Sequence, residues 1–404
     1  KTVAFCIPII NKLNIKNFKI QSLILAPTRE LANQIALEIR KLSRHIHNLK
    51  VLTLCGGTPF KPQVLSLSHG AHIVVATPGR VLKHIEQNNI DLENINTLVL
   101  DEADKMLDMG FYDDIMSIIN TLPTKRQTLL FSATYEKNIE KLASNVLLNP
   151  VVVKVENEEK VHIKQEFYYI DEENKTAFIP ALISSNKAKS ILIFCNMKIK
   201  CDKLADDLYA LGLDVLTLHS DLEQKQRDET IILFSNKSYP ILIATDVASR
   251  GLHIDDVDLV INYDLSLDEK IHTHRIGRTA RAGKGGLAIS LYTQNDFDRV
   301  EIIKETFSDI EDKSIDSVED DLSYKIDSEL RTIFINGGKK QKLRAGDILG
   351  ALTAGIGLQK DDIGKIDILD FASYVAINKE KISFVLERLS KEKIKGKYYR
   401  IYEK

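Results

Sequence analysis

Residues 98–104 (LVLDEAD) form a short apolar run that ends on three carboxylates. Similar short apolar runs, each followed by polar or glycine-containing residues, recur as far as residue 300. They lie at 22–25, 51–54, 73–76, 98–100 and 128–131, and then at 191–194, 215–218, 241–244, 259–262 and 288–291. Runs without alternation are typical of strands buried on both faces, and the ~15–25 residues between them suit crossover helices. We therefore expect two successive α/β units with parallel sheets.

Two polar stretches divide the chain. The first lies at 155–165, between the last run of one unit and the first run of the next. The second, at 308–322, holds seven acidic residues and one lysine, which predicts a solvated connector. We expect domains at 1–156 and 157–308, an acidic linker at 309–325 and a third domain at 326–404.

The third domain has a different pattern. The sequence predicts strands at 331–335, 365–369, 373–377 and 398–402, and helices at 345–353 and 380–390. This βαββαβ order indicates a small α+β sandwich. The domain has 16 Lys and Arg against 11 Asp and Glu, in a chain whose formal net charge is −2. A basic module on an acidic body favours contact with a polyanion.

Composition excludes several classes of protein. The 404 residues are 44% hydrophobic and 28% charged, which is not the composition of a disordered chain. No apolar run is long enough for a membrane helix, so we expect no membrane contact. The four cysteines form no CxxC pair, which argues against a zinc site or a disulfide framework and favours buried thiols in the reducing cytoplasm. Lys1 follows neither an initiator Met nor a signal peptide, and we expect the natural N-terminus to be missing.

The polar motifs follow the apolar runs, where ligands bind in open parallel sheets. They are PTRELA at 27–32, TPGR at 77–80, DEAD at 101–104, SAT at 132–134, ATDVASRG at 244–251 and HRIGRTAR at 274–281. This ordered series resembles the motifs of DEAD-box RNA helicases, over residues 1 to about 300. The resemblance implies two tandem RecA-like domains that use ATP and Mg²⁺.

Phosphoryl transfer needs cations around the phosphates, a metal and a positioned water. By the resemblance, Lys1 contacts the β- and γ-phosphates, Thr2 and Asp101 lie on the Mg²⁺ side, and Glu102 orients the attacking water. The implied nucleotide-binding residues are Lys1, Thr2, Asp101, Glu102, Gly251, His253, Arg278 and Arg281.

Arg278 and Arg281 are the candidate arginine fingers. Three residues apart, they point the same way if they lie on a helix. They belong to the second domain, so we expect hydrolysis to require closure of the two domains. The resemblance assigns Ser132, Thr134 and His274 to coupling closure with the state of the phosphates; by themselves they read as hydroxyl caps and a core histidine.

The RNA side rests on phosphate contacts. Hydroxyls and glycines allow close approach to a phosphodiester, and arginines bind its oxygens in a fork, without reading the sequence. The positions that match the family's RNA track are Thr28, Arg29, Gly57, Thr77, Gly79, Arg80, Gln224, Arg227, Thr245, Arg250 and Gly251. For one arginine alone, a surface ion pair is the alternative.

Residues 326–404 resemble the RNA-binding domain of the bacterial DbpA subgroup, an RRM-like fold. Two glycines and four cations (Lys339, Lys340, Lys342 and Arg344) predict a flexible basic loop at a positive helix end, which suits a phosphate. Residues 369–376 lack the aromatic string of an ordinary RRM, so we expect recognition through loops rather than the sheet face. The resemblance implies a 23S rRNA hairpin and pre-50S particles as partners of a monomeric assembly factor. Nonspecific RNA affinity is the alternative.

Three departures from the family qualify this interpretation. The glycine-rich part of the phosphate loop and the adenine-reading segment are absent from this sequence, so we expect it to bind ATP poorly. His253 replaces the usual aspartate that faces the ribose, which predicts weaker ATP binding, and Ala280 replaces a usual glycine.

Three other functions remain open from the sequence: an ATP-independent RNA-annealing chaperone, a DNA-translocating helicase and a general RNA helicase without rRNA targeting. The intact Asp101, Glu102, Arg278 and Arg281 argue against the chaperone. PTRELA, SAT and the C-terminal domain favour RNA over DNA.

Overall fold

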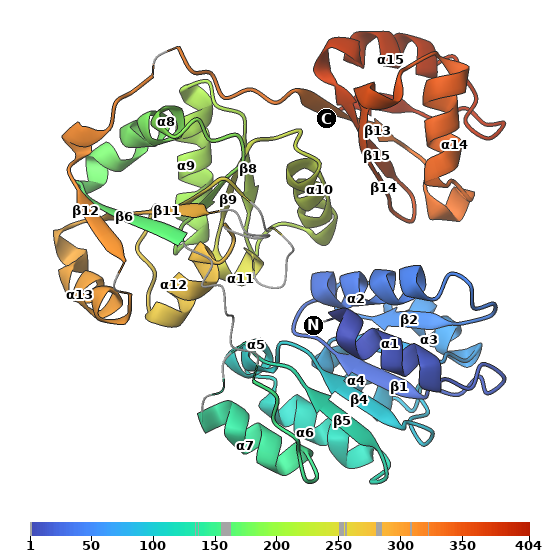
Figure 1. Cartoon of the computed structure of the whole chain (residues 1–404). Helices are drawn as coiled ribbons and strands as arrows, with labels where there is room; N and C mark the ends of the chain where they lie inside the picture. The colour runs from blue at the N-terminus through green and yellow to red at the C-terminus, as the bar shows by residue number, and fades with distance from the viewer. Residues whose placement is uncertain are drawn as a thin grey trace. The chain divides into compact units, whose positions relative to one another are not determined.

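The computed structural model describes residues 2–133, 135, 137–154, 163–249, 254, 257–279, 285–307, 309–321 and 323–404 (Figure 1). By contacts, the chain divides into two compact units. The first unit contains residues 1–156 and 250–253, and the second contains residues 157–249 and 254–404.

The first unit is a parallel sheet with helices on both faces. The strands, in the order β2-β3-β1-β4-β5, are β1 Ser22–Leu25, β2 Val51–Leu54, β3 Ile73–Ala76, β4 Thr97–Leu100 and β5 Gln127–Leu130. The helices are α1 Thr2–Lys12, α2 Arg29–Leu42, α3 Phe60–Ser68, α4 Pro78–Glu86, α5 Ala103–Asp108, α6 Tyr112–Thr121 and α7 Lys137–Val146. All five predicted apolar runs of this unit form strands, within a residue or two of the expected bounds.

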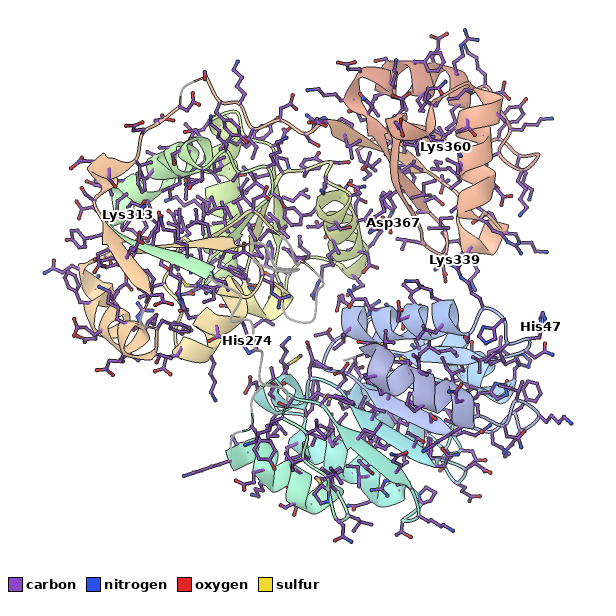
Figure 2. The ribbon with its side chains drawn as sticks, in the orientation of Figure 1. His47, His274, Lys313, Lys339, Lys360 and Asp367 are labelled. Carbon is purple, nitrogen blue, oxygen red and sulfur yellow. The ribbon has the colours of Figure 1, made fainter. Side chains whose placement is uncertain are left out.

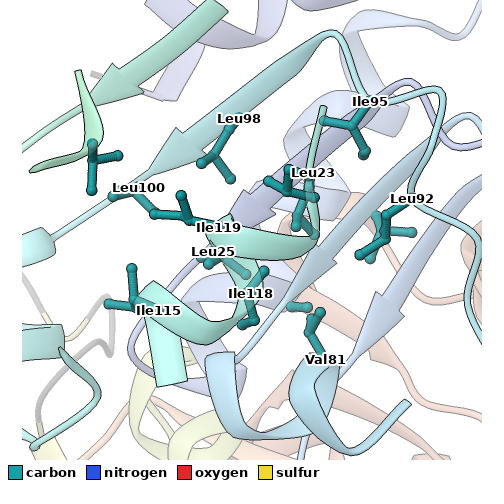
Figure 3. Close-up of a cluster of buried hydrophobic side chains, with 14 of the residues drawn as sticks. Leu23, Leu25, Val81, Leu92, Ile95, Leu98, Leu100, Ile115, Ile118 and Ile119 are labelled. Atoms are coloured by element: carbon teal, nitrogen blue, oxygen red, sulfur yellow. The ribbon is translucent and has the colours of Figure 1, made fainter. Parts of the chain in front are cut away.

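Both faces of this sheet carry a hydrophobic core. Figure 3 shows the face on which Leu23, Leu25 and Leu98 of the strands meet Val81 of α4 and Ile118 of α6. The opposite face packs against α1 and α2 in a second cluster. Burial on both faces explains why these strands are uninterrupted apolar runs.

The second unit contains a larger parallel sheet, with the strand order β12-β6-β11-β10-β7-β9-β8. Its strands are β6 Ile163–Tyr169, β7 Ile191–Phe194, β8 Val215–Leu218, β9 Ile241–Ala244, β10 Leu259–Asn262, β11 Gly286–Tyr292 and β12 Ile310–Lys313. Its helices are α8 Lys175–Ser185, α9 Lys198–Ala210, α10 Gln224–Ser235, α11 Asp246–Ser249, α12 Glu269–Ile276 and α13 Phe297–Thr306. Strands β6 and β12 were not predicted, because their polar residues hide the apolar pattern.

The acidic connector is more ordered than the sequence predicts. Its residues Ile310–Lys313 form β12, which pairs with β6, and Lys313 forms an ion pair with the buried Glu166. Further along, Ser184 donates to Asp320 Oδ1 over 2.6 Å, and Tyr324 donates to Ala188 O over 2.8 Å. The connector is therefore attached to the sheet domain, although most of its acidic side chains are exposed to solvent, as expected.

The C-terminal module (residues 326–404) forms an antiparallel sheet in the order β14-β15-β13-β16. Its elements are β13 Leu330–Ile335, α14 Ala345–Gly350, β14 Ile363–Ile368, β15 Ser373–Asn378, α15 Ile382–Leu389 and β16 Ile401–Glu403. Ile348 and Leu352 pack with Val385 and Leu389 over one face of this sheet. This is the expected βαββαβ order.

The other face of the module's sheet packs against α10 within the same unit. Phe334 and Tyr374 form an apolar cluster with Ile232 of α10. The Tyr374 hydroxyl donates to Glu229 Oε2 over 3.1 Å, and buried Thr332 accepts from Asn236 Nδ2 over 2.8 Å. Phe334 and Tyr374 of this face are therefore engaged by protein.

The expected fold class is confirmed: two parallel-sheet RecA-like domains and a small α+β domain. All four cysteines are buried and free of disulfides, as expected. Among the described residues, no helix combines the length and hydrophobicity that crossing a membrane requires.

Candidate functional site

The carboxylates of the DEAD motif stand at the carboxyl end of β4. Asp101 is buried, and its Oδ1 accepts the Glu102 amide over 3.1 Å. Glu102 has a left-handed backbone (φ 51°) directly before α5. Lys105, one turn on, places its Nζ 2.9 Å from Glu102 Oε1, while Glu102 Oε2 is buried without a hydrogen-bond partner among the described residues. The ion pair fixes one oxygen of Glu102 and leaves the other for a ligand or water.

The start of α1 lies near these carboxylates. Burial raises the pKa of the Cys6 thiol to about 12, and the negative charges of Glu38 and Asp101 add to this effect. Cys6 lies one turn of helix after Thr2 and packs in the same core cluster as Val99 of β4. A hydroxyl and a carboxylate are hard oxygen ligands of the kind Mg²⁺ takes.

The SAT motif and the residue before it are attached to the DEAD motif by hydrogen bonds that backbone amides donate. The Ala133 amide donates to Asp104 Oδ2 over 3.0 Å, and the Ala103 amide donates to Phe131 O over the same distance. A shift of residues 131–133 would therefore act directly on the start of α5. Ser132 is half-buried at this junction.

Thr28, Arg29 and Gly57 meet on the first unit. Thr28 caps α2 by accepting the Leu31 amide over 3.3 Å. Gly57 has a φ of +69°, and a Cβ there would lie 2.5 Å from Arg29 Nη1, so no other residue fits this close approach. Arg29 Nε and Nη1 are buried and have no hydrogen-bond partner among the described residues. This guanidinium has donors to offer an anion.

Arg80 lies in the same unit, in the first turn of α4. Its Nη1 donates to Thr58 O and to Gln63 Oε1, both over 3.1 Å. Burial lowers the pKa of Arg80, and the like charge of Arg29 acts in the same direction. Thr77 is the residue before α4, and a Cβ on Gly79 would lie 3.2 Å from Asp114 Oδ2. The structure thus brings the TPGR motif to the turn that contains Gly57.

In the second unit the motifs are joined by Arg275. Its five donors are all used: Nε and Nη2 donate to the two carboxylate oxygens of Asp246 over 2.7 Å each, and Nη2 also donates to Asn196 Oδ1 over 2.6 Å. Nη1 donates to Asp264 O over 2.7 Å and to Asn262 Oδ1 over 3.3 Å. Arg275 therefore links the ends of β7, β9 and β10.

Other predicted residues lie on separate elements of this unit. Thr245 is buried between β9 and α11, and Gln224 and Arg227 lie in the first turns of α10. His274 lies on α12, where Figure 2 labels it. Helix α12 ends at Ile276, and Arg278 follows it.

The basic loop of the C-terminal module exposes its side chains while its backbone is hydrogen-bonded. Lys339, Lys340, Lys342 and Arg344 are all exposed. A Cβ on Gly338 would lie 2.2 Å from Leu369 O, and the amides of Lys339 and Lys340 donate to Leu369 and Asp370 carbonyls over 2.9 and 2.8 Å. The glycines serve close packing, and the loop backbone is tied to residues 369 and 370 by hydrogen bonds.

The expected phosphate site at the start of α14 is also altered. Asp347 Oδ2 accepts the Arg344 amide over 2.9 Å and lies 3.0 Å from Lys395 Nζ. A carboxylate already caps this short helix, so positive charge here comes from lysine and arginine side chains rather than from the helix end.

Six predicted site residues lie outside the described residues: Lys1, Thr134, Arg250, Gly251, His253 and Arg281. Several structurally important residues were missed. Arg275 and Asp246 stood inside quoted motifs but received no role, and Lys105, Gln63 and His84 carried no signal in one sequence, because their significance depends on contacts across the fold.

Comparisons with known proteins agree with this arrangement. Residues 1–142 match the family model of DEAD/DEAH box helicases, residues 174–283 the helicase conserved C-terminal domain, and residues 332–403 the DbpA RNA binding domain. The chain is 43% identical over 402 residues to the ATP-dependent RNA helicase DbpA of Escherichia coli, covering 99% of this chain and 88% of that protein. It is 37% identical to the Bacillus subtilis DbpA, with the same shares covered.

A solved structure also resembles it: Saccharomyces cerevisiae Dbp5 bound to RNA and ADP BeF3, with 29% identity and a TM-score of 0.70, covering 78% of this chain and 83% of that one. The parallel-sheet units, the motifs at their strand ends and the full-length identity have one explanation: this chain belongs to the DbpA-type DEAD-box ATP-dependent RNA helicases.

Proposed function

We propose that this helicase acts on 23S rRNA during assembly of the large ribosomal subunit, with its C-terminal module holding a structured hairpin. The observation that carries the proposal is the basic loop of Lys339, Lys340, Lys342 and Arg344. The loop is exposed and ordered, whereas the sheet face that RRM domains use for base stacking packs against α10. A rigid basic loop suits a folded RNA.

For ATP hydrolysis, we assign Thr2 and Asp101 to the Mg²⁺ side of the nucleotide and Glu102 to the attacking water. Bound Mg²⁺ would neutralise charge on the phosphates. Lys105 holds Glu102 Oε1, so Oε2 is the atom that accepts a hydrogen bond from water. Lys1, Gly251, His253, Arg278 and Arg281 keep the nucleotide roles that the resemblance implies, with weaker ATP binding expected from His253.

For RNA, we assign the backbone contacts of the first unit to Thr28, Arg29, Gly57, Thr77, Gly79 and Arg80. The support is geometric: buried donors of Arg29 face a glycine turn that Arg80 also contacts. In the second unit, Gln224, Arg227, Thr245, Arg250 and Gly251 keep the same expected role. We also propose that the protein works as a cytoplasmic monomer.

The test measures RNA-stimulated ATP hydrolysis by the full-length protein, comparing a large-subunit rRNA hairpin with a generic duplex of equal length. In the loop variant, Lys339, Lys340 and Lys342 are changed to Gln. The control variant removes the same charge from exposed positions elsewhere on the module, at Lys360, Lys381 and Lys397.

We expect the hairpin to stimulate at ~10-fold lower concentration than the duplex, and the loop variant to lose this preference, because each lost phosphate contact weakens binding. The control should keep it within about 3-fold. Equal stimulation by both RNAs would leave a general RNA helicase and exclude rRNA targeting. Loss of preference in both variants would show nonspecific attraction.

A further inference from the structure

A buried network lies beside Arg80, among residues that no motif assigns to RNA. His84 of α4 is fully buried, and its ring stacks on Phe60 of α3 with centroids 4.3 Å apart. His84 Nε2 lies 3.0 Å from Gln63 Oε1. Lys83 Nζ lies over the ring of Phe60, 5.3 Å from its centroid. The contacts join α3 and α4 at the side of the turn at residues 55–58.

Gln63 uses both ends of its amide. Nε2 donates to Cys55 O over 3.2 Å and to Thr58 Oγ1 over 2.6 Å. Oε1 accepts from Arg80 Nη1 over 3.1 Å and from His84. A reversed amide would place its NH₂ group against the donor of Arg80, so the surroundings of Gln63 permit one orientation. The amide therefore joins the turn to Arg80.

The protonation state of His84 supports this orientation. Because Gln63 Oε1 is an acceptor, His84 Nε2 carries the proton. Burial, together with the nearby positive charges of Arg80 and Lys83, lowers the pKa of His84 to about 4. At neutral pH the imidazole is uncharged and acts as a fixed donor to Gln63.

The helix that carries Gln63 has few other anchors. None of the side chains of α3 is fully buried, so hydrophobic packing constrains this helix weakly. Thr58 Oγ1 also donates to Cys55 O over 2.9 Å, which closes the turn that Gln63 holds. Gly57 lies inside this turn and faces Arg29.

We infer that Gln63, oriented by His84, is a positioning residue for RNA binding: it holds the turn at residues 55–58 and the guanidinium of Arg80 as one preassembled surface for the RNA backbone. The inference rests on the proposed RNA role of Arg29, Gly57 and Arg80. A surface fixed before binding loses less conformational entropy when the RNA arrives, so its benefit appears in RNA affinity.

The test uses the full-length protein and three variants: Gln63→Met, His84→Phe and the control Gln87→Met, an exposed glutamine at the end of α4. Gln63→Met should raise the RNA concentration for half-maximal ATPase stimulation by about 5–10-fold, as expected for lost preorganisation. His84→Phe keeps a ring against Phe60 and removes the donor, with an expected rise of about 2–4-fold. The rate at saturating RNA and the KM for ATP should stay unchanged, as should every value for the control.

A double-mutant cycle separates positioning from general stabilisation. If Gln63 acts through Arg80, Gln63→Met should cost less than about 2-fold in an Arg80→Met background, because the partner is already gone. Additive effects, or a fall in the saturated rate with an unchanged RNA requirement, would overturn the inference. If Gln63→Met does not fold, the same cycle is run with His84→Phe.

Different outcomes would reject the RNA role of this surface and the positioning role of Gln63. An unchanged RNA requirement in Arg80→Met and Gly57→Ala would remove the proposed RNA role of this surface. A raised requirement in those two variants, with Gln63→Met and His84→Phe equal to the parent protein, would reject the positioning role alone.

Discussion

Two arginines, one in each helicase domain, have opposite surroundings. Arg275 of the second unit is fully buried, and all five of its donors meet acceptors on Asp246, Asn196, Asn262 and Asp264. Arg29 of the first unit is half-buried, with Nε and Nη1 shielded from water and no acceptor among the described residues. The guanidinium of Arg275 uses all its hydrogen bonds within the protein, whereas that of Arg29 has donors left for a ligand.

Two buried histidines show the same difference. His272 of the second unit contacts Gln165 Oε1 at 2.8 Å and Ser266 Oγ at 3.3 Å, so both ring nitrogens have partners. His84 of the first unit contacts Gln63 through Nε2, while Nδ1 has no partner in the described part of the chain. Buried polar atoms without hydrogen-bond partners are costly, so their retention beside a glycine turn marks a surface shaped for a ligand. A buried side chain whose polar atoms all have partners, as in Arg275 and His272, serves the structural framework of the domain.

The largest expected effect is on Arg275. Arg275→Met should destabilise the second unit by roughly 3–5 kcal/mol, because it leaves the Asp246 carboxylate and the carbonyl of Asp264 without their cation. The measurement is urea unfolding, monitored by the hydrogen exchange of the backbone amides in β9 and β10. The control is Arg299→Met, which breaks a more exposed ion pair with Asp296 and should cost under about 1 kcal/mol. Similar losses in the two variants would contradict the framework role.

Acidification should weaken both units through their histidines. The pKa values of His84 and His272 are lowered to about 4 by burial, whereas an unfolded histidine has a value of 6.5. The unfolded chain therefore binds more protons between these values. Stability is fully present above about pH 6.5 and falls as the pH approaches 4, by roughly 1.4 kcal/mol per pH unit for each histidine.

Unfolding at several pH values, with hydrogen exchange reporting each unit, checks this prediction. His84→Phe should flatten the profile of the first unit only, and His272→Phe that of the second. A profile unchanged by either substitution would assign the acid sensitivity to carboxylates instead.

Sequence reasoning found the features that have a short-range signal. Strands buried on both faces appear as apolar runs with polar motifs after them, so the strand at Leu98–Leu100 and the position of Asp101 at its end were predicted correctly. Strands β6 and β12 were missed because Lys164, Glu166 and Lys313 satisfy one another across the sheet edge, and a lone strand with such residues resembles a linker.

The rest depended on contacts between distant segments. Gln63 and Arg80 are far apart in sequence and meet only because α3 and α4 flank one turn. The glycines at 337 and 338 suggested flexibility, although their cause is the close approach of Leu369 O and Tyr399. A glycine in a sequence shows only that the residue has no Cβ. The fold is needed to show whether close packing or mobility requires the glycine.

Arg29 should behave in the opposite way to Arg275. Arg29→Met is expected to leave the stability of the first unit within about 0.5 kcal/mol, since its buried nitrogens make no internal hydrogen bond. RNA affinity should fall about 10-fold through the loss of a charge-assisted contact. Fluorescence anisotropy of a labelled RNA and urea unfolding measure the two quantities. Arg44→Met, which removes an exposed charge from the same unit, should change affinity by less than about 2-fold.

A large loss of stability in Arg29→Met without weaker RNA binding would place Arg29 with Arg275 in the framework. Arginine donors without acceptors in the protein would then not identify the residues that bind RNA.

The smallest expected effect concerns the covered sheet of the C-terminal module. Tyr374→Phe removes the hydrogen bond to Glu229 but keeps the ring that packs on Ile232, and Lys404 still pairs with Glu229. The expected cost is about 1 kcal/mol, read as faster hydrogen exchange in α10 and β15. RNA affinity should not change, because Tyr374 packs against α10 and is covered by the protein itself. Weaker RNA binding with unchanged exchange would show instead that Tyr374 faces RNA, and that α10 and RNA compete for one surface.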